Sequence, residues 1–297
     1  MSDSINNINW YPGHMKKTRE LIRENLKMVD LVVELVDSRI PVSSRNPIID
    51  ELTQGKPRLI LLNKADLADP AETERWKAAL LDTGKASKGA GNSAGVVSVL
   101  AMDSRSGDNL KAFYKVLEGI QAEVNARRQR NRPLRMMIVG VPNVGKSSFI
   151  NRLAGKRSAK TGDKPGVTRG KQWIALENGM QLLDTPGILW PKFEDRQVGL
   201  NLAFCGSIKD EVMNAQDLGF ELIKVLGTRY PDNLKERYKL DEVSDDALTN
   251  MEAIATKRGF LMPGRRIDYE RTGRTVLDEF RTGKLGRITL EPAPAKE

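Results

Sequence analysis

The sequence contains a single cysteine, a single histidine and no long run of apolar residues. Because Cys205 has no second cysteine to pair with, the chain cannot form an intramolecular disulfide and needs no oxidising compartment. No segment approaches the roughly 18 consecutive apolar residues of a membrane-spanning helix. The first residues also lack the basic and apolar regions of a secretory signal. We therefore expect a cytoplasmic protein that does not bind a membrane.

Charge is distributed unevenly along the 297 residues. Lysine and arginine outnumber aspartate and glutamate by 48 to 39, which gives a formal net charge of +9. Thirteen basic residues and one acidic residue fall within 125–173, whereas 205–252 is mainly acidic and 253–287 mainly basic. Such basic clusters favour a polyanionic partner such as nucleic acid. The simpler alternative is a charged, solvated surface.

Six apolar runs predict buried β-strands, at 31–37, 58–63, 95–101, 134–140, 171–176 and 180–184. They are continuous rather than alternating, as expected for strands covered on both faces. Helical patterns at 70–82 and 108–125 separate some of them, which indicates an α/β fold with a mostly parallel sheet and helices on both faces. A Gly- and Ser-rich stretch at 83–95 predicts a surface loop. No strand pattern follows residue 191, so a small all-helical domain is expected after the sheet.

The clearest motif is GVPNVGKS at 140–147, a complete GxxxxGK[ST] phosphate-binding loop between a predicted strand and a predicted helix. In such a P-loop the backbone N–H groups surround a phosphate and the lysine reaches the β- and γ-phosphates. The Ser147 hydroxyl would bind magnesium. The predicted nucleotide contacts are Asn143, Val144, Gly145, Lys146, Ser147 and Ser148.

A second motif, NKAD at 63–66, predicts that the nucleotide base is guanine. It ends a predicted strand, at the sheet edge where the ligand-binding loops of parallel sheets emerge. The Asp66 carboxylate can accept hydrogen bonds from both guanine N1–H and the 2-amino group, a donor pair that adenine lacks. Asn63, Lys64 and Asp66 are therefore predicted to bind GTP. The alternative for Asp66 is a helix-capping role.

Residues 184–187, DTPG, form a DxxG motif after the last predicted strand. Asp184 is expected to hold magnesium, and the Gly187 amide to contact the γ-phosphate. Between the P-loop and DxxG, Thr168 is the candidate for the switch threonine that binds magnesium in the GTP state; its alternative is an ordinary loop threonine. Residues 100–102 are a weak counterpart of the SAK-type loop that lies against guanine.

The order of these motifs indicates a circular permutation. An ordinary GTPase has the P-loop, switch threonine and DxxG before NKxD and the SAK-type loop, whereas here the last two come first. Permutation preserves a site if the original termini lie close together. It also leads the second switch, after Gly187, almost directly into the helical domain. We expect a permuted P-loop GTPase domain at 1–194, a helical domain at 195–284 and a C-terminal tail at 285–297.

These motifs resemble those of the YlqF/RbgA family of circularly permuted ribosome biogenesis GTPases. The resemblance covers nearly the whole chain and includes WYPGHM, DSRIPVSSRNP, NKADL, GVPNVGKSS, KPGVT, DTPGILWP and FRTGKLGRITLE. It implies an RNA-binding helical domain and GTP hydrolysis stimulated by the large ribosomal subunit or its precursor. It also implies a role in late assembly of that subunit.

Further roles for three residues follow from the resemblance. The position after DxxG, often a water-orienting glutamine in other GTPases, is Ile188, so another group must place the attacking water. His14 is the candidate for this catalytic role, because its ordinary pKa suits proton transfer. Its alternative is to pack against or cap the predicted helix at 16–28. Asn143 stands where potassium-stimulated relatives place an asparagine that helps to bind K⁺, a charge that elsewhere comes from an arginine finger.

The expected function is therefore a GTP-hydrolysing switch that binds the precursor of the large ribosomal subunit and its rRNA. It would use Mg²⁺ and K⁺ and act as a monomer. One alternative is a nucleotide-gated rRNA-binding placeholder in which hydrolysis is incidental. Another is a GTPase that acts on a different RNA, such as tRNA, or at a membrane, although the missing apolar anchor argues against the membrane. Binding to rRNA predicts an affinity that falls steeply with salt.

Overall fold

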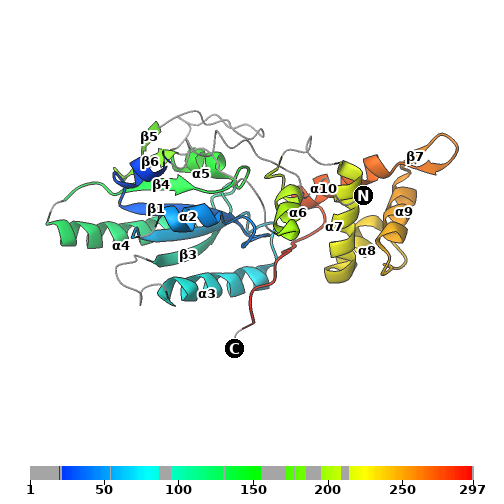
Figure 1. Ribbon diagram of the computed structural model, residues 1–297, viewed down its shortest axis with the longest axis horizontal. Helices are drawn as coiled ribbons and strands as arrows, with labels where there is room; N and C mark the ends of the chain where they lie inside the picture. The colour runs from blue at the N-terminus through cyan, green and yellow to red at the C-terminus, as the bar shows by residue number, and fades with distance from the viewer. Residues whose placement is uncertain are drawn as a thin grey trace. The chain divides into compact units, whose positions relative to one another are not determined.

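The computed structural model describes residues 20, 22–53, 55–86, 95–129, 131–154, 172–176, 178–184, 195–208 and 214–295. They belong to two compact units (Figure 1). The first contains the described residues from 20 to 184 together with 291–295, and the second contains those from 195 to 290. The predicted tail at 285–297 is thus divided after Leu290, and its next residues return to the first unit.

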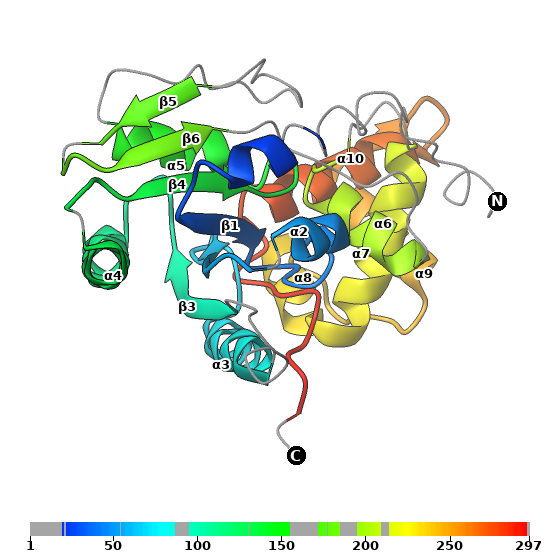
Figure 2. The same cartoon turned by 60° about the vertical axis from the view of Figure 1, so that its left-hand side comes forward.

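The first unit is built on a six-stranded sheet in the order β3-β2-β1-β4-β6-β5 (Figure 2). Every neighbouring pair is parallel except β5 and β6, which are antiparallel. The strands are β1 (Leu31–Asp37), β2 (Arg58–Asn63), β3 (Val96–Met102), β4 (Arg135–Val139), β5 (Gln172–Ala175) and β6 (Gln181–Asp184). The predicted mostly parallel α/β sheet is confirmed. Burial on both faces explains the continuous apolar runs, since every residue of β1 is buried.

Four helices connect these strands: α2 (Pro47–Leu52), α3 (Pro70–Ala86), α4 (Leu110–Arg128) and α5 (Lys146–Leu153). From β1 to β3 the chain moves towards one edge of the sheet, and from β3 to β4 and β6 it returns. Right-handed crossovers between parallel strands therefore place α2 and α3 on one face and α4 on the other, and α5 packs beside α4. The packing agrees, because Trp76 of α3 joins a cluster with Ile60, while Phe113 of α4 meets Phe149 of α5 with ring centres 5.1 Å apart.

The predicted loop at 83–95 begins later than expected, because α3 continues to Ala86. A single glycine inside a helix costs only about 1 kcal/mol, so Gly84 does not end α3. Residues 87–94 lie outside the described residues.

The strand order reverses between β1 and β4, and this reversal fixes where a ligand can bind. Crossovers on the two sides of the reversal go to opposite faces, which leaves a crevice at the carboxyl ends of the strands. The P-loop follows β4, the NKAD motif ends β2, and Asp37 ends β1. The fold thus places these three segments at one edge of the sheet.

The described part of the second unit contains five helices and one short hairpin: α6 (Arg196–Phe204), α7 (Ala215–Arg229), α8 (Pro231–Tyr238), α9 (Ala247–Arg258), β7 (Leu261–Met262), β8 (Arg266–Ile267) and α10 (Tyr269–Arg281). The sequence predicted an all-helical domain and did not predict this hairpin. Each of its strands has only two residues, too few to give a recognisable strand pattern. The helices α7 and α10 cross at Gly219 and Gly273, where a Cβ on either glycine would overlap the other helix. No helix described here is long and apolar enough to span a bilayer.

The chain after Leu290 is held on the first unit by hydrogen bonds. The Glu291 carboxylate accepts hydrogen bonds from the N–H groups of Val42, at 2.6 Å, and Ser43, at 3.0 Å. The Glu291 carbonyl accepts one from the Trp76 indole at 2.8 Å. Ala293 follows and packs against the same apolar cluster as Trp76. Glu291 therefore satisfies backbone groups of the loop that follows β1.

We expect Glu291→Ala to lower the free energy of unfolding by about 1–2 kcal/mol, because two backbone donors lose a charged acceptor. Chemical denaturation followed by circular dichroism measures this change. The control is Glu74→Ala, which removes an exposed glutamate paired with Lys77 on the surface of α3. This control should cost only a few tenths of a kcal/mol. Equal effects of the two substitutions would show that the Glu291 contacts do not stabilise the unit.

Candidate functional site

The P-loop lies at the reversal of strand order, between β4 and α5. Gly145 caps the start of α5 with a φ of 104°, and a side chain there would collide with the Asn63 amide. Glycine meets both demands because it has no Cβ and tolerates positive φ. No side chain caps the first turn of α5 in the described structure. Its backbone N–H groups, together with the positive end of the helix dipole, suit a bound phosphate.

Lys146, the first residue of α5, is buried within the P-loop. Its ammonium donates hydrogen bonds to the carbonyls of Gly140, at 2.9 Å, and Val141, at 2.8 Å. A phosphate in the loop would be a stronger, charged acceptor than these carbonyls. The arrangement therefore supplies a cation that can turn from the loop to the ligand.

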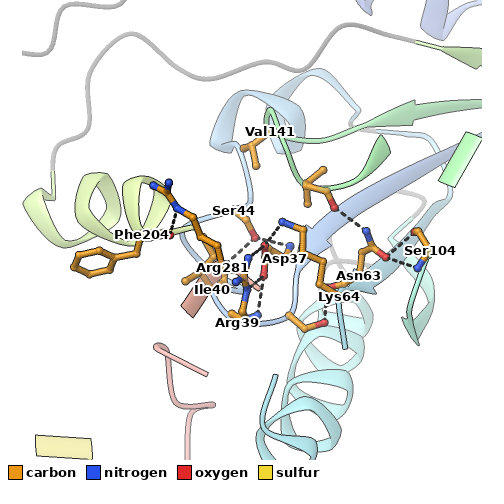
Figure 3. A network of polar contacts seen from close by, with 12 residues as sticks. Asp37, Arg39, Ile40, Ser44, Asn63, Lys64, Ser104, Val141, Phe204 and Arg281 are labelled. Atoms are coloured by element: carbon orange, nitrogen blue, oxygen red, sulfur yellow. Dashed lines mark hydrogen bonds and ion pairs between the residues drawn. The ribbon is translucent and has the colours of Figure 1, made fainter. Parts of the chain in front are cut away.

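Asn63, the first residue of NKAD, joins three segments of the site (Figure 3). Its Nδ2 donates to the carbonyl of Val144 in the P-loop at 2.7 Å. Its Oδ1 accepts from the hydroxyl of Ser104 at 2.6 Å and from the backbone N–H of Ser104 at 3.1 Å. The buried amide is thus bonded to the protein on both sides. Asn63 holds the phosphate-binding loop against the NKAD loop and the loop after β3.

The structure corrects the predicted counterpart of the SAK-type loop. Residues 100–102 are not a loop, because they belong to β3 and pair with residues of β2 up to Asn63. The loop that follows runs through 103–109, and its Ser104 contacts Asn63. The sequence interpretation ended the strand one residue early and overlooked Ser104. The signal for it was the turn-forming composition of DSRSGDN after the apolar run.

Two carboxylates lie at the open side of these loops. Asp66 is exposed. The pKa of its carboxyl is nevertheless raised, because neighbouring atoms shield part of it from water and because Asp103 is negatively charged. The Asp103 carboxylate instead accepts hydrogen bonds from the N–H groups of Arg105, at 2.8 Å, and Ser106, at 3.0 Å. Although partial burial alone raises the pKa of Asp103, these hydrogen bonds lower it overall. Asp103 therefore shapes the loop that follows β3.

The ammonium of Lys64 reaches the end of β1, where it contacts Asp37 at 2.8 Å (Figure 3). Asp37 in turn forms a bidentate ion pair with Arg39, and both residues are 1% exposed. The sequence pattern DSRIPVSSRNP, which contains both residues, predicts no role for either of them. The available signal was an acidic and a basic residue, Asp37 and Arg39, at the end of a predicted buried strand.

Comparisons with known proteins agree with this geometry. A family model described as 50S ribosome-binding GTPase matches residues 135–254. The Ribosome biogenesis GTPase A of Bacillus cereus is 48% identical over 285 residues, which cover 96% of this chain and 93% of that protein. Its counterpart in Priestia megaterium is 46% identical over 296 residues, covering 98% and 99%. The chain belongs to the ribosome biogenesis GTPase A family.

Solved structures extend the match from sequence to fold. The crystal structure of GNP-bound YlqF from T. maritima superposes with a TM-score of 0.63 at 29% identity, covering 94% of this chain and 100% of that one. This member of the ribosome biogenesis GTPase A family is therefore a GTPase with the circularly permuted domain expected from the motif order. The NKAD motif lies before the range matched by the family model, as the permutation requires.

Only some of the remaining predicted site residues lie within the part of the chain that the structure describes. Ser147 lies in the first turn of α5, and Asp184 ends β6, the strand next to β4. A hydroxyl and a carboxylate at neighbouring positions are oxygen donors of the kind that magnesium prefers. His14, Thr168 and Gly187, together with Ile188, lie outside the described residues. Their predicted roles stay predictions.

Among the described residues of the 125–173 segment, three arginines make contacts within the GTPase unit. Arg128 and Arg132 both contact the buried Asp30 carboxylate, at 2.6 Å and 2.7 Å. Arg135 donates to the Gln181 side chain at 2.9 Å. The two contacts with Asp30 attach the end of α4 and the segment before β4 to the start of β1.

Proposed function

We propose that this GTPase binds a precursor of the large ribosomal subunit, promotes its late assembly and times its own release by GTP hydrolysis. The observation that carries the proposal is the joining of the P-loop to the NKAD loop through Asn63 in a permuted domain. In this chain order the second switch, after Asp184, leads to α6 at Arg196. A change at the γ-phosphate would therefore act on the helical unit through a short covalent link. The names of the relatives support the ribosomal partner.

The nucleotide would be held by the residues of the P-loop and the NKAD motif, with Mg²⁺ on Ser147, Thr168 and Asp184. K⁺ would bind beside Asn143, whose left-handed backbone with a φ of 57° shapes the P-loop at this point. Such an ion supplies positive charge near the transferring phosphoryl group. Because Ile188 cannot orient a water molecule, we assign that task to His14.

The second unit would supply the contact with rRNA. Its residues from 253 to 287 carry an excess of basic side chains. The β7–β8 hairpin places exposed Leu261 and Met262 beside exposed Arg265 and Arg266. Basic side chains would bind phosphates, and the exposed apolar side chains would pack on unstacked bases. We further propose that the protein acts as a cytoplasmic monomer.

The test measures GTP turnover by the full-length protein with and without purified large ribosomal subunits, in potassium and in sodium. We expect at least a tenfold stimulation by large subunits in potassium, and a much smaller one in sodium. Small subunits are the control and should give none. His14→Ala should keep nucleotide affinity and lose the stimulation. Equal turnover under all conditions would refute the proposal, and a His14→Ala variant with normal stimulation would refute the role of His14.

A further inference from the structure

The side chain of Lys64 is held in one orientation in the described structure. The residue has a left-handed backbone, with a φ of 58°, in the turn that leaves β2. Its ammonium is 2.8 Å from Oδ2 of Asp37, and its side chain is only 22% exposed. A lysine side chain on a surface turn ordinarily samples many rotamers. Here one long-range ion pair selects an orientation between the ends of β1 and β2.

Asp37 is a rigid anchor for this ion pair. Arg39 donates from Nε to Oδ1 at 2.9 Å, from Nη2 to Oδ2 at 2.8 Å and from its backbone N–H to Oδ1 at 3.1 Å. The backbone N–H of Asp37 donates to the Ser44 hydroxyl at 2.9 Å. Burial alone would raise the pKa of Asp37, but the charges of Arg39 and Lys64 hold it well below its usual range. Asp37 therefore stays ionised and in one orientation.

The charges of this cluster do not cancel. Arg39 already satisfies the Asp37 carboxylate in a bidentate pair, so Lys64 is not needed to neutralise it. Among these three residues two cations face one carboxylate, and the next carboxylate along the NKAD loop, Asp66, is exposed and within electrostatic reach of Arg39. Asn63, the residue before Lys64, contacts the P-loop. The Lys64 ammonium thus belongs to the residue next to the one that joins the NKAD loop to the P-loop.

We propose that Asp37 is a positioning residue for the guanine nucleotide and acts through Lys64. It fixes the lysine in advance, so that the stem of Lys64 borders the base and its ammonium faces the sugar and phosphates. Ordering this side chain before binding removes an entropic cost from the binding step. The proposal rests on the proposed role of the NKAD loop in holding guanine.

The experiment compares GDP affinity, measured with a fluorescent GDP analogue, in the wild type, Asp37→Asn, Lys64→Met and the double variant. We expect each single substitution to weaken binding about tenfold. The double variant should be no weaker than Lys64→Met, because Asp37 acts only through the ammonium that this substitution removes. Losses that multiply in the double variant, or a Lys64→Met variant with wild-type affinity, would overturn the proposal. Unchanged affinity in Asp37→Asn would overturn it as well.

The matched control is Asp30→Asn at the other end of β1. Asp30, like Asp37, is a buried aspartate with two basic partners, here Arg128 and Arg132. This substitution should cost stability and leave GDP affinity unchanged. Since Asp37→Asn leaves Arg39 without an anionic partner, unfolding is measured for every variant. Lys64→Met keeps the Asp37–Arg39 pair and tests the proposal even if Asp37→Asn does not fold. Guanine preference retained by Asp66→Asn would refute the role of the whole loop, whereas unchanged GDP affinity in Asp37→Asn refutes only this proposal.

Discussion

Asp66→Asn is expected to convert the GTPase from a guanine-binding to a xanthine-binding protein. The carboxylate accepts two hydrogen bonds from guanine, from N1–H and the 2-amino group. An asparagine amide has one acceptor and one donor, which suit the N1–H and the 2-carbonyl group of xanthine. Each charged hydrogen bond contributes about 1.5–3 kcal/mol, so GDP affinity should fall by about 100-fold or more. Xanthosine diphosphate should become the preferred ligand.

Competition binding with GDP and xanthosine diphosphate measures this exchange of preference. Asp69→Asn is the matched control, because Asp69 lies in the same loop but caps α3 through the N–H of Ala71 at 2.8 Å. Asparagine caps helices as well as aspartate does, so this variant should keep both stability and guanine preference. An Asp66→Asn variant that still prefers guanine would show that a different group recognises the base.

Lys146→Ala is expected to reduce the rate of GTP turnover by about 100- to 1,000-fold. The ammonium lies within the P-loop and would move from two carbonyls to the β- and γ-phosphates. Loss of a preorganised positive charge at a transferring phosphoryl group costs catalysis on this scale. GDP affinity should fall less than turnover, because GDP lacks the γ-phosphate on which charge develops.

The control is Lys56→Ala, since Lys56 also donates to a backbone carbonyl, that of Val29, at 2.8 Å. Lys56 thus makes the same kind of contact as Lys146, but at the opposite, amino-terminal end of the strands. Single-turnover hydrolysis should be normal in this variant. Hydrolysis by Lys146→Ala at a rate near that of Lys56→Ala would exclude the assigned role of Lys146.

The sequence predicted the sheet and both nucleotide motifs because each leaves a contiguous signal. A strand buried on both faces is a run of apolar residues, and the P-loop is set by glycines and a lysine at fixed spacing. The motif order was sufficient to infer the permutation. The sequence defined the ends of the strands less well, since the loop that contains DSRSGDN could start at any of several residues after the apolar run. Pairing of β3 with β2 up to Met102 decided the start of that loop.

The chain by itself thus determined the fold class, the P-loop and the guanine-reading motif. The tertiary structure decided how these parts are joined. Asn63 meets Val144 across 81 positions of the chain, Lys64 meets Asp37 across 27, and Glu291 meets Val42 across 249. No local pattern predicts these pairs, because a polar residue that bonds to a distant partner is of the same residue type as one that is exposed to water. Strand order brings the partners together, and burial then makes each hydrogen bond or ion pair necessary.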